Sequence, residues 1–162
     1  MAVPAIDATP SGLSSNSYVT LTEAVEYLEM RPGGQEFTAL DVERQRAALL
    51  FAVVLIERET FWGYKVDLDQ ALEFPRGRDV LIPEKVRHAQ IEQALDIANG
   101  GFIQRENFLE SQSLGIRQLS SDDTLSRFLP STPMAIASKG LAPATLRLLS
   151  GYTEWNVMLG RA

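Results

Sequence analysis

The sequence predicts a mainly α-helical protein: a three- to four-helix bundle with a small β-hairpin inserted before the last helix and extended N- and C-terminal arms. Apolar residues recur at helical spacing in four segments, which capping residues or Gly and Pro stops delimit. The hairpin is expected at about 111–130, where apolar and polar residues alternate weakly. The 162 residues, 45% of them hydrophobic, suffice for one domain with its own core. We expect an N-terminal arm at 1–17, a helical domain at 18–151 and a C-terminal tail at 152–162.

The first two helices have clear boundaries in the sequence. Thr20 with Glu23 three residues later forms a capping box, and Pro32 followed by two glycines ends the first helix. Residues 1–17 show no periodicity, which is typical of a loose or extended arm. The second helix, from about Leu40 to Thr60, is apolar on nearly all sides, as the central helix of a bundle usually is.

An aromatic segment and a proline turn follow the second helix. The aromatic cluster suits a hydrophobic lid over one end of the bundle, a contact surface for a neighbouring subunit, or both. Pro75 restricts its own backbone and that of Phe74, so that Phe74 can be held against the bundle while Arg76 points elsewhere. These residues form a structural elbow: Phe61, Trp62, Tyr64, Phe74, Pro75 and Arg76.

The third helix is expected from Pro83 to Ala98, where Asn99 and two glycines stop it. The hairpin follows, and because an isolated hairpin is marginal in water, it must pack on the helices or on a partner. Its candidate subunit-interface residues are Leu114, Ile116, Arg117, Leu125, Arg127 and Phe128.

A fourth helix is expected at about 143–150, and an apolar tail follows it. Within the tail, Tyr152, Trp155, Met158 and Leu159 recur at helix-like spacing. The tail either folds back onto its own core or anchors another protein, because Trp, Tyr and Met are favoured at interfaces.

The sequence offers little for catalysis, metal binding or cofactor binding. There is no cysteine, and His88 is the only histidine, next to Arg87 in the third helix. A calcium loop starting at Asp67 would need Gly and Glu where Leu72 and Arg78 stand. No phosphate-binding loop surrounds the paired glycines. We therefore expect no enzymatic activity, no metal and no cofactor.

The net charge of -6 makes DNA or RNA a less favoured tight ligand, because nucleic-acid binders usually carry a basic patch. An acidic surface can still line a passage through which DNA slides. No apolar run approaches the roughly 20 residues that span a bilayer, and the N-terminus lacks a signal peptide's features. We expect a protein made in the cytoplasm, with no membrane partner.

The order of several segments resembles the head–tail adaptor (connector or neck) proteins of tailed bacteriophages. The segments are S-Y-V-T-L-T-E-A-V-E-Y-L at 17–28, A-L-L-F-A-V-V-L-I at 48–56, F-W-G-Y-K at 61–65, Q-A-L-E-F-P-R at 70–76, I-P-E-K-V-R-H-A-Q-I-E-Q-A-L at 82–95 and G-L-A-P-A-T-L-R-L-L at 140–149. Residues 111–139 depart from the adaptor pattern, because the hairpin region is longer than expected.

This resemblance implies a structural virion protein of the head–tail neck. Usually twelve copies form a homo-oligomeric ring that binds the portal protein and continues the DNA channel. Genome DNA would then pass through the lumen without specific binding, and a downstream neck or tail-completion protein would dock below. The resemblance also implies that the tail residues Tyr152, Trp155, Met158 and Leu159 bind the portal.

The alternative is a single-stranded-DNA-binding module of a phage replication protein. Proteins similar to this chain are sometimes labelled as resembling a primosomal DNA-binding protein, and Trp62 and Tyr64 could stack on bases. The acidic balance argues against this alternative. Binding at or below a roughly micromolar Kd in physiological salt would favour it.

Overall fold

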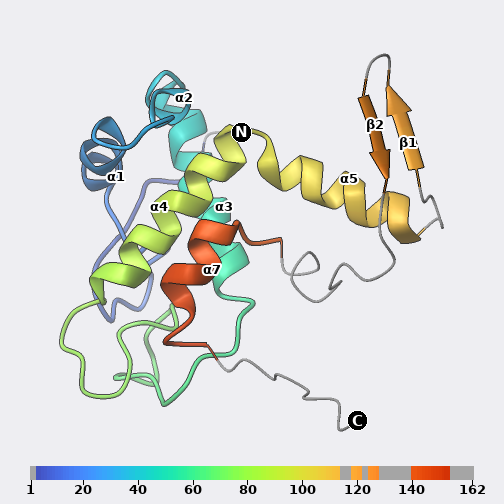
Figure 1. Ribbon diagram of the computed structural model, residues 1–162. Coiled ribbons are helices and arrows are strands. Elements are labelled where there is room, and N and C mark those ends of the chain that lie inside the picture. The colour runs from blue at the N-terminus through green and yellow to red at the C-terminus, as the bar shows by residue number, and fades with distance from the viewer. Residues whose placement is uncertain (1–2, 114–117, 122–123, 128–139, 154–162) are drawn as a thin grey trace, which may run out of the picture.

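The computed structural model describes residues 3–113, 118–121, 124–127 and 140–153, with only the backbone described at 111–113 and in the two strands. Over these residues the chain is mainly helical, as predicted (Figure 1). The helices are α1 (Leu21–Glu29), α2 (Gln35–Thr38), α3 (Val42–Ile56), α4 (Glu84–Ala98), α5 (Gly101–Ser113) and α7 (Pro143–Leu149). Two antiparallel strands, β1 (Gln118–Ser121) and β2 (Thr124–Arg127), lie between α5 and α7, with Gln118 opposite Arg127.

The predicted capping box at the start of α1 is confirmed. The Thr20 side chain accepts the Glu23 backbone N–H, and the Glu23 carboxylate accepts the Thr20 N–H. Asp41 caps α3 by accepting the Arg44 N–H at 2.9 Å. These contacts span three residues, which explains why the sequence alone predicts them.

The central helix of the described fold is α4, and the prediction that the second helix is central was wrong. α4 contacts each of the other five described helices, and Figure 1 shows it beside α7 and in front of α3. The buried residues of α4 include polar ones, so α4 is not apolar on nearly all sides as a central helix usually is. Gln90 is fully buried and binds Ser17 Oγ at 2.8 Å, the Leu49 carbonyl at 3.1 Å and the Tyr18 N–H at 2.8 Å. Because its amide is satisfied, burial carries little penalty.

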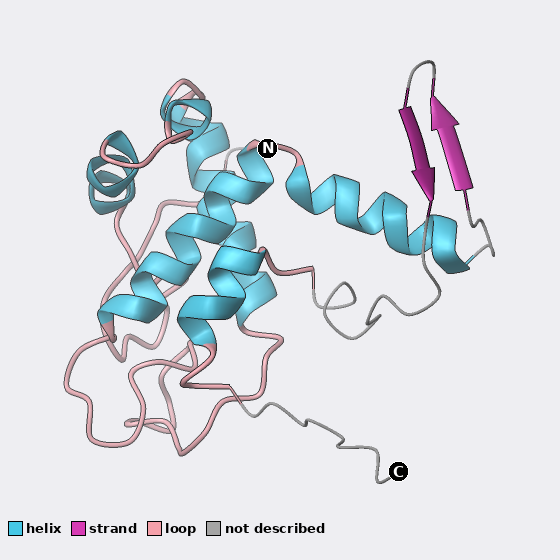
Figure 2. Cartoon of the chain, viewed as in Figure 1, coloured by secondary structure: helices cyan, strands magenta, loops and turns pink. Residues whose placement is uncertain are grey.

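Two helices are absent from the sequence-based prediction. α2 is a single turn that buries Phe37. α5 begins directly after Gly100, whose positive φ of 75° turns the chain, so the predicted glycine stop ends α4 without ending helical structure. Contacts across this turn hold α5 to the bundle: Arg105 pairs with Asp96, and the Phe102 ring meets Phe51 edge-on at 5.1 Å. Figure 2 shows α5 leading away from the other helices towards the strands.

The described part of the N-terminal arm is irregular but held in place. The Asp7 N–H donates to Asn16 Oδ1 at 2.8 Å, and the Asp7 carbonyl accepts from Asn16 and Ser17. Gly12 accepts a hydrogen bond from the Ala71 N–H at 3.0 Å, which joins the arm to the segment between α3 and α4. The loose arm expected from composition is therefore a packed segment over residues 3–17.

No helix within the described residues is both long enough and apolar enough to cross a membrane.

Candidate functional site

The connection between α3 and α4 is a long loop, seen at the lower end of the molecule in Figure 2. Backbone contacts brace it without making it a strand. Trp62 N–H donates to the Tyr152 carbonyl at 2.8 Å, and Gly77 N–H donates to the Tyr64 carbonyl at 2.8 Å. Isolated β-bridges pair Phe61 with Thr153 and Lys65 with Arg76. We refer to residues 61–82 as the aromatic loop.

Phe74 fixes the aromatic loop to the core. Only 2% of its surface is exposed. Its ring meets three others edge-on, with centroid distances of 4.9 Å to Phe61, 5.6 Å to Tyr152 and 6.0 Å to Tyr18. The peptide bond between Phe74 and Pro75 is cis. Phe74 therefore lies against the bundle.

Arg76 lies along the back of the aromatic segment. Its guanidinium donates to the carbonyls of Phe61 and Trp62, each at 3.0 Å, and to that of Gly63 at 2.6 Å. It also pairs with Glu73, and the Arg76 side chain is only 11% exposed. One arginine thus holds three consecutive carbonyls, a role that the sequence did not reveal.

Trp62 and Tyr64 point away from the core. Trp62 is 62% exposed and Tyr64 67% exposed, whereas Phe61 is buried. The indole Nε1–H donates to the Thr153 carbonyl at 3.0 Å, which fixes the edge of the ring. The lid interpretation therefore holds for Phe61, while Trp62 and Tyr64 form two braced aromatic groups on the surface.

Charged side chains of both signs lie in and around the aromatic loop. Most described cations lie within 4.0 Å of a carboxylate, for example Arg31 beside Glu92. Some described cations have no carboxylate partner: Arg46, Arg58, Arg78, Lys85 and Arg147. Arg58 lies three residues before the loop, Arg78 lies in it and Lys85 lies three residues after it, and all three are exposed.

The loop and the arm beside it also carry exposed apolar side chains. They belong to the loop or, for Leu13, to the arm hydrogen-bonded to it: Leu13, Val66, Leu68, Val80 and Leu81. The sequence places them beside turn residues, where exposure is expected.

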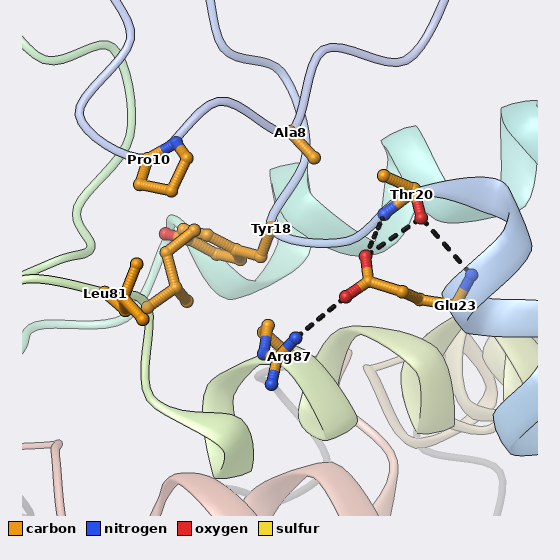
Figure 3. Close-up of a pocket in the computed structure, with 8 residues that line it drawn as sticks. Ala8, Pro10, Tyr18, Thr20, Glu23, Leu81 and Arg87 are labelled. Atoms are coloured by element: carbon orange, nitrogen blue, oxygen red, sulfur yellow. Dashed lines mark hydrogen bonds and ion pairs between the residues drawn. The ribbon is translucent and has the colours of Figure 1, made fainter.

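A cavity of about 180 Å³ lies where the end of the aromatic loop meets the arm, α1 and α4. Figure 3 shows Pro10 and Leu81 on one side, Thr20 and Glu23 on the other, and the Tyr18 ring between them. Its lining residues are Ala8, Pro10, Tyr18, Thr20, Glu23, Leu81, Ile82 and Arg87. Three separate chain segments therefore build one pocket.

Two carboxylates beside this pocket have shifted pKa values. Burial acts to raise the pKa of Glu23, but hydrogen bonds from Thr20 and the Arg87 charge outweigh it and hold the pKa below the ordinary value. Burial raises the pKa of Glu57, which accepts hydrogen bonds from the Tyr18 hydroxyl and the Glu73 N–H. Burial also raises the pKa of Tyr18 well above its ordinary value.

The remaining candidate residues lie partly outside the described structure. Tyr152 is half-buried against Phe74, so this first tail residue folds onto the core. Outside the described residues lie Trp155, Met158, Leu159, Leu114, Ile116, Arg117 and Phe128, and only the backbone is described at Leu125 and Arg127.

His88 is a half-buried helix residue. It stacks on Tyr27 with a centroid distance of 4.5 Å and approaches Glu84 at 3.7 Å. The described residues contain no group of three or more His, Cys, Asp or Glu placed to hold a metal.

A family model described as "Putative DnaT-like ssDNA binding protein" matches residues 6–115, which is more than half of the chain. The match runs from the arm through the aromatic loop to the end of α5. No curated protein and no solved structure matches the chain.

This match overturns the resemblance to head–tail adaptors and the connector ring inferred from it. The partners inferred from that resemblance are also contradicted: the portal, the neck or tail-completion protein, and DNA that passes without binding. The segments that carried the resemblance owe much of their pattern to packing: Leu49, Leu55 and Ile56 of the 48–56 segment are fully buried. Patterns that serve a helical core recur in unrelated helical proteins. The expected place in a virion came from the same resemblance and stays an untested prediction.

Proposed function

The chain belongs to this family of DnaT-like ssDNA-binding proteins, and we propose that it binds single-stranded DNA through the aromatic loop. The observation that carries the proposal is the pair of exposed rings, Trp62 and Tyr64, on a braced backbone. Every base has a flat π-face, so such rings bind a single strand with little regard to sequence.

The bracing matters because a stacking group that is already ordered loses less entropy on binding. Trp62 is fixed by its backbone contact to Tyr152 and by its indole contact to Thr153. Arg76 fixes the carbonyls of the same segment from behind. A strand that stacks on Trp62 and Tyr64 therefore meets a formed surface.

The unpaired cations beside the rings suit the phosphates of the strand. Arg58 and Arg78 flank Trp62 and Tyr64 along the chain, and Gly77, the neighbour of Arg78, is hydrogen-bonded to Tyr64. The two carboxylate oxygens of Glu73 pair with Lys65 and Arg76. Arg58 and Arg78 thus lie near the rings along the chain without a carboxylate partner among the described residues, although the loop also carries Asp67, Asp69 and Asp79. The overall negative charge favours modest affinity and keeps non-specific binding to duplex DNA weak.

We propose a binding role without a reaction step, since stacking and phosphate contact require no catalytic group.

The test is the affinity of the full chain for a fluorescein-labelled oligo(dT) of about 15 nucleotides, measured by anisotropy in physiological salt. Alanine substitution of a stacking residue costs about 1–3 kcal/mol per base, so Trp62→Ala and Tyr64→Ala should each weaken binding by about five- to 150-fold. Met30→Ala is the matched control, because Met30 is 83% exposed at the end of α1, outside the loop.

A second arm of the test varies the salt. Arg78→Ala should lower the slope of log Kd against log salt by about 0.7, because one phosphate contact of a single strand is lost. Wild-type affinity for Trp62→Ala and Tyr64→Ala together would refute the proposed site. Absence of oligo(dT) binding by the wild type at about 100 μM would refute the function.

A further inference from the structure

We propose that the pocket between the arm, α1 and α4 holds one guanine base of the bound strand. This proposal rests on the single-strand binding proposed above. The position of the pocket supports it. Leu81 and Ile82, at the end of the aromatic loop, form part of its wall, so the stacking surface and the pocket share one loop. The Tyr18 ring, in the pocket, contacts the Phe74 ring at 6.0 Å, and the Phe74 ring contacts that of Phe61 at 4.9 Å. Phe61 is the neighbour of Trp62. A strand within the site sizes of single-strand binders, about 4–16 nucleotides, can reach both.

Arg87 lines the pocket and has one edge without a protein partner in the described part of the chain. Its Nη1 donates to Glu23 Oε1 at 2.8 Å, and its Nε is buried with no partner. In Arg31 the equivalent edge, formed by Nε and Nη2, binds both oxygens of Glu92. In Arg87 this edge has no protein partner among the described residues. A buried donor without a partner is unusual, and a ligand with two adjacent acceptors would satisfy this one.

The neighbouring carboxylate selects a neutral ligand over a phosphate. Glu23 is ionised at neutral pH, because Thr20 and Arg87 hold its pKa below the ordinary value against the effect of burial. Its charge offsets that of Arg87, so an anion in the pocket would gain little. Guanine is neutral and presents O6 and N7 side by side, the pair of acceptors that an arginine edge binds most often.

The size and lining of the pocket suit one base. About 180 Å³ is below the roughly 300–1,000 Å³ of pockets for drug-sized ligands, but it exceeds a single water's share of about 30 Å³ several-fold. Pro10 and Leu81 supply apolar walls for the faces of a flat ring, and Arg87 supplies the polar side (Figure 3). The Arg87 side chain is 38% exposed, so it has room to turn its covered Nε towards a base.

The experiment measures the affinity of the full chain for thymine oligonucleotides of about 15 nucleotides that differ only at the central position. The central base is thymine, guanine, cytosine or 7-deazaguanine, which lacks the N7 acceptor. We expect guanine to bind at least about fivefold more tightly than thymine, the lower end of what one bidentate pair discriminates. The 7-deazaguanine oligonucleotide should lose that advantage while the protein is unchanged.

A protein variant tests the guanine preference independently of the modified base. Arg87→Lys retains a positive charge beside Glu23 but lacks the two-donor edge, so its ratio of guanine to thymine affinity should fall to about one. Arg44→Lys, on the exposed part of α3, should keep the wild-type ratio. Circular dichroism checks that both variants are folded.

Equal affinity for guanine, 7-deazaguanine and thymine would overturn the pocket assignment while leaving the stacking surface intact. A preference for cytosine, which offers O2 and N3 side by side, would overturn the assignment to guanine. Failure to bind any of the oligonucleotides would instead refute the proposed function itself.

Discussion

Arg76→Ala tests whether the aromatic loop is braced from behind. The substitution removes three hydrogen bonds to the carbonyls of Phe61, Trp62 and Gly63, as well as the ion pair with Glu73. Truncation also removes the guanidinium that lies 6.0 Å from the centre of the Phe61 ring. The loop would then keep its backbone hydrogen bonds, among them those from Trp62 to Tyr152, from Gly77 to Tyr64 and from Val66 to Pro75.

The expected loss of stability in Arg76→Ala depends on which of these carbonyls water can reach. The carbonyls of Trp62 and Gly63 accept in exposed hydrogen bonds, so water can replace Arg76 there. The Phe61 carbonyl is partly buried, and a hydrogen bond to a charged group contributes about 1.5–3 kcal/mol. Glu73 keeps Lys65 at 3.3 Å. We therefore expect the free energy of unfolding to fall by about 2–3 kcal/mol.

Two assays measure the effect. Urea unfolding gives the change in stability, and hydrogen exchange should accelerate at the Val66 and Gly77 amides, which donate across the base of the loop. Oligo(dT) affinity should fall by about two- to tenfold, because each side chain ordered on binding costs about 0.5–1.5 kcal/mol. Arg76→Lys should recover little, since lysine lacks the planar set of donors.

Arg44→Ala is the control, because Arg44 is 75% exposed and paired only with a neighbouring exposed aspartate. Its unfolding free energy should stay within about 0.5 kcal/mol of the wild type. Arg76 does not brace the loop if Arg76→Ala unfolds like this control and binds oligo(dT) with wild-type affinity.

Two further perturbations test the core beneath the loop. Phe74→Ala should lower the free energy of unfolding, measured by urea denaturation, by about 3–5 kcal/mol, because Phe74 is buried among three rings. Tyr64 is exposed, so Tyr64→Ala should change this free energy by about 0.5 kcal/mol or less. A Phe74→Ala cost below about 1 kcal/mol would contradict the packing. Burial raises the pKa of Glu57, so its ionisation opposes folding, and wild-type stability should improve relative to Glu57→Gln as the pH falls from 7 towards about 4.3. Urea midpoints measured across this range check the direction, and a relative loss of stability would show that ionised Glu57 is favoured in the fold.

The sequence predicts those parts of the fold that depend on local contacts. The box of Thr20 and Glu23 joins residues three apart, and Pro143 opens α7 at the position that the missing proline N–H allows. The start of α5 is different, because Arg105 pairs with Asp96 across a glycine turn that resembles an end of helical structure. Such pairs form only once the chain has folded back.

The candidate site was predictable in residue type but not in arrangement. Trp62 and Tyr64 stand out in the sequence, but their exposure depends on Arg76, Tyr152 and Thr153, which come from other segments. The pocket around Arg87 combines residues from 8–23 with residues from 81–87, which are far apart in the chain, so no local spacing signals it. The net charge of -6 does not show which cations lack a carboxylate partner.

Photo-crosslinking locates the bound strand on the protein without a mutation. The full chain is irradiated with an oligonucleotide that carries 5-bromodeoxyuridine in place of thymine, and the modified peptide is identified by mass spectrometry. We expect the crosslinks to fall on Trp62 or Tyr64, and an excess of unlabelled oligo(dT) to suppress them. Crosslinks confined to peptides outside residues 58–87, with the same competition by oligo(dT), would contradict the assignment of single-strand binding to the aromatic loop.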